Sequence, residues 1–216
     1  VRFCFEKLTG LETDLIAFSD DMDGFRKVPD NVPNKEQLSK YLDYPLTTVP
    51  DPFNICNSFG EHNNAKLVEF LNRFNLPFTF QSSTEAYKSG VFNETIKKIL
   101  LNYDKILNVV LPTLGDDRRK TYSPFFPIDE NTGKILQVSV NEVNTDDFTI
   151  SFTHEGKNHV KSVLDGQCKL QWKVDWAMRW AAFGVDYEMC GKDLTESYVL
   201  SSKICRIIGS KPPENL

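Results

Sequence analysis

A change in hydrophobic periodicity near residue 121 constrains the fold more than any other feature of the sequence. From Asn93 to Pro112, apolar residues recur at intervals of three and four, which is the spacing of one helix face. Between about 121 and 165, the segments ILQVSV, FTISFTH and HVKSVL alternate or run apolar between turn residues. Helical spacing returns after Asp175. A small antiparallel meander therefore interrupts a chain of helices and single strands.

Single strands are predicted on both sides of this meander. The apolar run 15–18 reads as a buried strand, and VDYEMC at 185–190 reads as a short one. Asp175 is expected to cap a helix over 176–183, and Thr195 to cap a helix carrying Leu200 and Ile204. Alternating helices and strands favour a parallel sheet. The sequence thus predicts an α/β fold with an inserted α+β subdomain.

Composition narrows the functional classes. The 216 residues carry a net charge of −5, which gives no sign of nucleic-acid binding, and no stretch reaches about 18 apolar residues. Five cysteines without a Cys-x-x-Cys pair predict reduced thiols in the cytoplasm and no zinc site. They are Cys4, Cys56, Cys168, Cys190 and Cys205.

Three aspartates crowd the end of the first predicted strand, in SDDMDGF at 19–25. Asp21 and Asp23 have the spacing of a magnesium-dependent, haloacid-dehalogenase-type phosphatase with an aspartyl nucleophile. Two features weaken this alternative. The acidic pair at 116–117 follows a helix instead of a strand, and Phe25 stands where a small or β-branched residue is usual. The simplest alternative is that the aspartates only cap and turn the chain.

All three tryptophans fall within nine positions, in LQWKVDWAMRW. Trp176 and Trp180 are four residues apart on one helix face, and Asp175 lies among them. An aromatic wall beside a carboxylate suits a cation on an aliphatic stem. The alternative is a tryptophan-rich core face with a capping aspartate.

Four long sequence blocks help to decide between a cation-binding site and a tryptophan-rich core face: SDDMDGFRKVPDNVPN, SFGEHNNAKL, LPTLGDDRRKTYSPFFPI and LQWKVDWAMRWAAFGVDYEMCGKDL. Together, and in this order, they resemble class I lysyl-tRNA synthetases of the bacterial branch. The resemblance implies a Rossmann-type catalytic domain split by a connective insertion. Residues 1–45 and 172–216 would form its two parts, and residues 46–171 the insertion. It also implies activation of L-lysine by ATP with Mg²⁺, transfer to tRNA(Lys), a cytoplasmic location and no membrane partner.

Two motifs of this family do not occur in the sequence: the HIGH-type ATP motif and the KMSKS-type loop. The resemblance places them outside residues 1–216, so no catalytic residue is assigned. The chain is expected to be an internal piece of the catalytic domain that cannot form lysyl-adenylate by itself. Its oligomeric state is left open.

The resemblance assigns binding roles to seven residues. Trp172, Asp175 and Trp176 face the substrate lysine, Gly191 and Asp193 the nucleotide, and Asp21 and Asp23 the active-site rim. Replacing Asp175 with alanine in the full-length enzyme should raise the KM for lysine at least tenfold, about 1.4 kcal/mol.

Alternatives remain for two parts of this assignment. Gly191 to Asp193 equally fits a plain strand-to-helix turn, and Leu194 replaces a histidine of some relatives. Archaeal relatives carry a cysteine zinc knuckle in the insertion, whereas FPIDENTGKILQ at 126–137 has no cysteine, so no zinc is expected.

A non-catalytic tRNA-binding module is the third possible functional class, with residues 118–120 as a basic contact. Salt-sensitive tRNA binding without ATP turnover would favour it.

Overall fold

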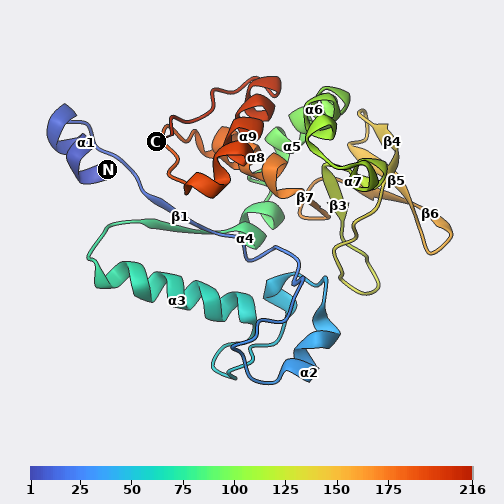
Figure 1. The fold of residues 1–216 in the computed structure, drawn as a ribbon, viewed down its shortest axis with the longest axis horizontal. Helices are drawn as coiled ribbons and strands as arrows, with labels where there is room; N and C mark the ends of the chain where they lie inside the picture. The colour runs from blue at the N-terminus through green and yellow to red at the C-terminus, as the bar shows by residue number, and fades with distance from the viewer. Residues whose placement is uncertain (216) are drawn as a thin grey trace. The chain divides into compact units, whose positions relative to one another are not determined.

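The computed structural model describes residues 1–215, which form two compact units, one of residues 1–86 and one from Tyr87 onward (Figure 1). The boundary between the two units falls within the short helix Ser83–Lys88 and not at residues 45 or 171, where the resemblance places the domain boundaries. The three-part domain organisation that the resemblance implies therefore stays a prediction.

The first unit is built around two parallel strands. Strands β1 and β2 run side by side (Figure 1), with Ile16 of β1 opposite Thr79 of β2 and Ser19 opposite Ser82 in the register of the pair. The predicted strand at 15–18 is thereby confirmed, shifted by one residue. The elements of this unit are α1 (Arg2–Thr9), β1 (Ile16–Ser19), α2 (Lys35–Leu38), α3 (Phe59–Arg73), β2 (Thr79–Ser82) and α4 (Ser83–Lys88), which crosses into the second unit, with 3₁₀ turns at Ser39–Tyr41 and Leu46–Thr48.

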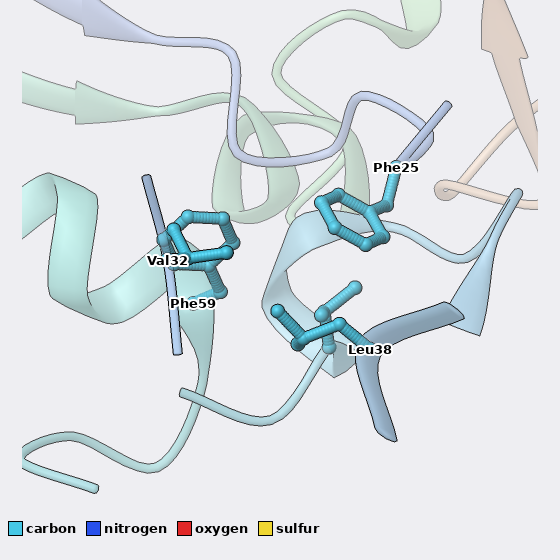
Figure 2. Close-up of a cluster of buried hydrophobic side chains, with 5 residues drawn as sticks. Phe25, Val32, Leu38 and Phe59 are labelled. Atoms are coloured by element: carbon cyan, nitrogen blue, oxygen red, sulfur yellow. The ribbon is translucent and has the colours of Figure 1, made fainter. Parts of the chain in front are cut away.

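A small apolar core holds the segment that follows β1. It consists of Phe25, Val32, Leu38, Val49 and Phe59, four of which are labelled in Figure 2. The rings of Phe25 and Phe59 meet edge to face, with centroids 6.1 Å apart. Phe25 therefore anchors the aspartate-rich loop to the start of α3, and this explains a large aromatic residue at that position.

The second unit combines helices with two small antiparallel sheets. Strands β4, β5 and β6 form one sheet and β3 and β7 the other, so the predicted meander is confirmed, although its first strand, at 140–144, begins only at the last residue of ILQVSV. The elements are α5 (Asn93–Leu101), α6 (Tyr103–Val110), a 3₁₀ turn (Leu111–Thr113), α7 (Asp116–Thr121), β3 (Phe125–Pro127), β4 (Val140–Asn144), β5 (Thr149–His154), β6 (Lys157–Ser162), β7 (Cys168–Leu170), α8 (Trp172–Phe183), a 3₁₀ turn (Lys192–Leu194) and α9 (Thr195–Ile207).

The predicted capping role of Asp175 is wrong. Helix α8 already begins at Trp172, and the side chain of Gln171 accepts a hydrogen bond from the Lys173 amide. Asp175 lies in the first turn of α8, and its carboxylate accepts hydrogen bonds from Tyr87 and Arg179 instead of capping the helix. The segment VDYEMC is likewise not a strand, because it makes only one parallel bridge, between Tyr187 and Glu214.

Helices α8 and α9 pack against each other and carry much of the core of this unit. Val174, Ala177 and Met178 of α8 are fully buried, as is Ile204 of α9. The Ser201 hydroxyl donates to the Lys173 carbonyl at 2.8 Å and links the two helices. Among the described residues, none of the helices has the length and apolar character needed to cross a membrane.

Burial of two thiols gives a first testable expectation. Cys168 and Cys205 are buried, and desolvation raises the pKa of the Cys205 thiol to about 11, whereas Cys4 is exposed. The thiolate is the reactive form. Iodoacetamide at pH 8 should therefore modify Cys4 within minutes and the two buried thiols only after unfolding, as followed by peptide mass spectrometry. Early modification of Cys205 in the folded chain would contradict this packing.

Candidate substrate site

The three tryptophans form a row along one face of α8. The ring centroids of Trp172 and Trp176 are 5.8 Å apart, and those of Trp176 and Trp180 are 4.9 Å apart. Tyr198 of α9 continues the row, 5.5 Å from Trp180. Trp172 is 39% exposed and Trp180 only 1%. The three tryptophans therefore run from the exposed ring of Trp172 to the buried ring of Trp180.

Glu188 is the polar partner of this tryptophan row. The indole N–H groups of Trp176 and Trp180 both donate to its Oε2, at 3.1 and 2.7 Å. Its backbone is held as well, because its amide donates to the Glu214 carbonyl and its carbonyl accepts from Asn215 Nδ2. The carboxylate is therefore fixed in place from both the side-chain and the main-chain side.

Glu188 was missed at the level of sequence. A signal was available, because buried indole N–H groups usually find an acceptor and three clustered tryptophans need several. Sequence spacing alone could not identify which acidic residue accepts these hydrogen bonds, since Glu188 lies 12 residues beyond Trp176 in a segment predicted to be a strand.

Asp175 lies on the buried side of α8, with no solvent exposure. Its Oδ1 accepts a short hydrogen bond from the Tyr87 hydroxyl and lies 3.4 Å from Lys169 Nζ. Its Oδ2 accepts from Arg179 Nε at 2.6 Å. Burial by itself would raise the pKa of this carboxyl, but Arg179 and Lys169 outweigh burial and lower it below the usual value. Both oxygens thus already bind groups of the chain itself.

The predicted nucleotide-side residues lie at the turn before α9. Gly191 and Asp193 are both exposed, and the Leu194 amide donates to the Gly191 carbonyl. A Cβ atom at Gly191 would lie 2.5 Å from Asp193 Oδ1, so the Asp193 side chain folds back over the glycine. The structure keeps these two residues together, and glycine leaves room for that carboxylate.

The predicted rim residues lie in the first unit. Asp21 is buried, and its carboxylate accepts from Asn64 Nδ2, Ser82 Oγ and the Thr84 amide at 2.9, 2.6 and 2.8 Å. Asp23 is partly exposed, and its carbonyl accepts from the Leu46 amide. With three donors bound to it, the Asp21 carboxylate serves as a structural acceptor, which does not suit a free nucleophile.

A second group of ligand-type atoms lies in the first unit. One side-chain atom each from Asp51, Cys56 and His62 falls within 4.8 Å of the others, and Asp51 Oδ2 is 3.2 Å from His62 Nδ1. Such a nitrogen, sulfur and oxygen set is a type that can hold Zn²⁺. The expectation of no zinc rested on residues 126–137 and on the spacing of the cysteines, Cys56 among them, and that spacing did not show that these three side chains meet.

The Asp51 carboxylate also has a sufficient role without an ion. It accepts hydrogen bonds from the amides of Phe53, Ile55 and Cys56 at 3.1, 2.9 and 2.9 Å. Burial would raise the pKa of this carboxyl, but these bonds together with His62 lower it. The Phe53 ring stacks on His62, with centroids 4.7 Å apart. Asp51 therefore organises the loop that leads into α3.

Comparison with known proteins identifies the class. The family model described as tRNA synthetases class I (K) matches residues 1–216, so the chain belongs to the class I aminoacyl-tRNA synthetases of this family. The phosphatase alternative is therefore wrong.

The similar proteins carry a more specific name. Lysine–tRNA ligases of Rickettsia felis and Rickettsia bellii are 50% identical to the chain over its whole length, and that of Rickettsia prowazekii is 50% identical over 99% of it. The chain spans 40–42% of the length of these relatives. The resemblance read from the four sequence blocks is thereby confirmed.

Proposed function

We propose that this chain is part of the catalytic core of a lysine–tRNA ligase. In the whole protein it would help to activate L-lysine with ATP and Mg²⁺ to lysyl-adenylate and to transfer the lysyl group to tRNA(Lys) in the cytoplasm. The observation that carries this proposal is the 50% identity to lysine–tRNA ligases across the entire chain. Because the chain spans about two fifths of those relatives, the activity is proposed for the whole protein and not for these residues alone.

We also propose that β1 and β2 belong to a Rossmann-type sheet that a connective insertion interrupts. The insertion predicted at 46–171 would contain β2, which pairs with β1, so the inserted part would begin after Ser82. Parallel strands normally occur in sheets covered on both faces. All four residues of β1 are only partly buried, and among residues 1–215 this sheet has just two strands. A parallel pair with so little cover is typical of part of a larger sheet.

The site roles follow from this proposal. Trp172 and Trp176 would cover the methylenes of the lysine substrate, because they form the outer part of the tryptophan row. Gly191 and Asp193 would contact the nucleotide from an exposed turn before a helix N-terminus. Asp21 and Asp23 would shape the rim, Asp21 by fixing the end of β1. A contact between Asp175 and lysine stays a prediction, and its partners support a structural role.

Lysine-dependent ATP–pyrophosphate exchange tests the proposed function. The full-length protein should catalyse exchange with L-lysine, and the 216-residue chain alone should not. Exchange with another amino acid in place of lysine would refute the substrate assignment. Salt-sensitive tRNA binding by a full-length protein that shows no exchange would instead support the non-catalytic tRNA-binding module.

A further inference from the structure

We infer that Asn215 positions the exposed turn at Gly191 to Asp193, the turn proposed to contact the nucleotide. This inference rests on the proposed function and deepens it. It names a side chain outside the turn, and outside every motif of the sequence, that sets the apparent affinity for ATP. Asn215 is a positioning residue, because it acts on the chain that leads into the turn and not on the nucleotide itself.

The first argument concerns the side chain of Asn215. Its Nδ2 donates to the Glu188 carbonyl at 2.7 Å and to Cys190 Sγ at 3.3 Å. A side-chain amide carries two N–H donors, so it can serve both acceptors at once. The second of these contacts lies immediately before Gly191. Together they fix the direction in which the chain enters the turn.

The second argument concerns the main chain before the turn. The Glu188 amide donates to the Glu214 carbonyl at 3.0 Å, and the Glu214 amide donates to the Asp186 carbonyl at 2.9 Å. These two hydrogen bonds hold residues 186–188 parallel to the segment that carries Asn215. The pairing is short, because Tyr187 and Glu214 form a single bridge.

The side chain of Asn215 continues this attachment where the main chain no longer provides it. Among residues 1–215, the main-chain groups of Met189 and Cys190 make no hydrogen bond. The next main-chain hydrogen bond runs from the Leu194 amide to the Gly191 carbonyl at 2.9 Å and closes the turn itself. The amide of Asn215 therefore bridges the interval between the paired segment and the turn.

The third argument concerns the support of Asn215. Pro212 and Pro213 are buried, and the Tyr198 hydroxyl of α9 donates to the Pro213 carbonyl at 2.6 Å. Helix α9 begins at Thr195, directly after the 3₁₀ turn. The same helix thus holds the exit of the turn directly and its entrance through residues 213–215. A turn fixed at both ends presents Gly191 and Asp193 in one arrangement.

Loss of the Asn215 amide would release only the entrance of the turn. Gly191 and Asp193 are exposed, and glycine has a large conformational freedom to lose. A smaller fraction of molecules would then hold the turn ready for the nucleotide, and the apparent affinity falls with that fraction. Glu188 would keep its bonds to Glu214 and to the two indoles, so the tryptophan row stays in place.

The test uses the full-length protein and the variant Asn215→Leu, which has a similar shape and lacks both donors. The KM for ATP in lysine-dependent pyrophosphate exchange should rise about 3- to 10-fold, the range for loss of a neutral hydrogen bond, while the KM for lysine stays within twofold. Hydrogen exchange should become faster in a peptide of residues 186–194 and stay unchanged in α8 and α9. Asn131→Leu, the same change at an exposed asparagine of this unit, is the matched control.

The outcomes separate this inference from the proposed function. If the wild type shows lysine-dependent pyrophosphate exchange and Asn215→Leu has the same KM for ATP, the inference is overturned and the proposed function stands. If the variant raises the KM for lysine equally, or speeds hydrogen exchange throughout α8 and α9, Asn215 only supports the fold and the inference is again overturned. If the wild type shows no lysine-dependent pyrophosphate exchange, both are overturned together.

Discussion

Replacing Asp175 with alanine is expected to lower the free energy of unfolding of the second unit by about 3–5 kcal/mol, because it leaves buried cations without their counter-charge. Arg179 and Lys169 both lie against this carboxylate, and the Tyr87 hydroxyl would lose its acceptor. All three tryptophans lie between residues 172 and 180, so urea denaturation followed by tryptophan emission reports on this unit.

Two controls sharpen this expectation. Asp186→Ala removes an exposed carboxylate from the same unit and should change the free energy of unfolding by no more than about 0.5 kcal/mol. The pKa of Asp175 is lowered in the folded chain, so its stabilising effect is complete above the unfolded pKa of about 4 and is lost as the pH falls through the lower folded value. The difference between wild type and variant should therefore shrink only below about pH 4. A difference that stays constant down to pH 2 would exclude this ionic role.

This prediction also bears on how lysine recognition is measured. A tenfold rise in the KM for lysine in Asp175→Ala would be expected from a contact with substrate, but also from a loosened α8 that displaces the tryptophan row. The KM alone therefore does not identify a contact.

The parts of the fold that could be predicted from sequence rest on local signals. Helix α9 and the strands β5 and β6 follow from periodicity and turn residues within short windows. The pairing of β1 with β2 could not be predicted, because Thr79 to Ser82 contain one apolar residue and lie about 60 residues from their partner. Nor could the start of α8, since Asp175 resembles a cap until its distant partners are known.

The same distinction holds for the candidate site. Helical spacing predicted that Trp176 and Trp180 share one face, and Trp172 joins them because α8 begins at Trp172 and not after Asp175. Its acceptor, Glu188, approaches from beyond the end of that helix, and no local pattern signals it. Asp51, Cys56 and His62 meet because a loop folds back on the first turns of α3, at spacings that match no standard metal motif. Local sequence patterns therefore do not identify the side chains that meet these residues from distant parts of the chain.

The second large effect is expected at Asp21. Its carboxylate joins three elements of the first unit: Asn64 of α3, Ser82 at the end of β2, and the Thr84 amide in the first turn of α4. A negative charge at that amide is also favoured by the helix dipole. Asp21→Ala should lower the free energy of unfolding of this unit by about 3 kcal/mol, because it leaves buried donors without an acceptor.

The first unit contains no tryptophan, so hydrogen exchange followed by mass spectrometry is the suitable measurement for Asp21→Ala. Peptides covering residues 59–66 and 79–86 should exchange much faster than in the wild type, whereas peptides of α8 and α9 should not change. Asp30→Ala, at an exposed position of the same unit, is the matched control and should leave all of these rates unaltered. If Asp21→Ala exchanged like Asp30→Ala, the aspartate-rich loop would not be holding β1, β2 and α3 together. The buried carboxylate would then need another explanation, such as a direct role at the catalytic rim.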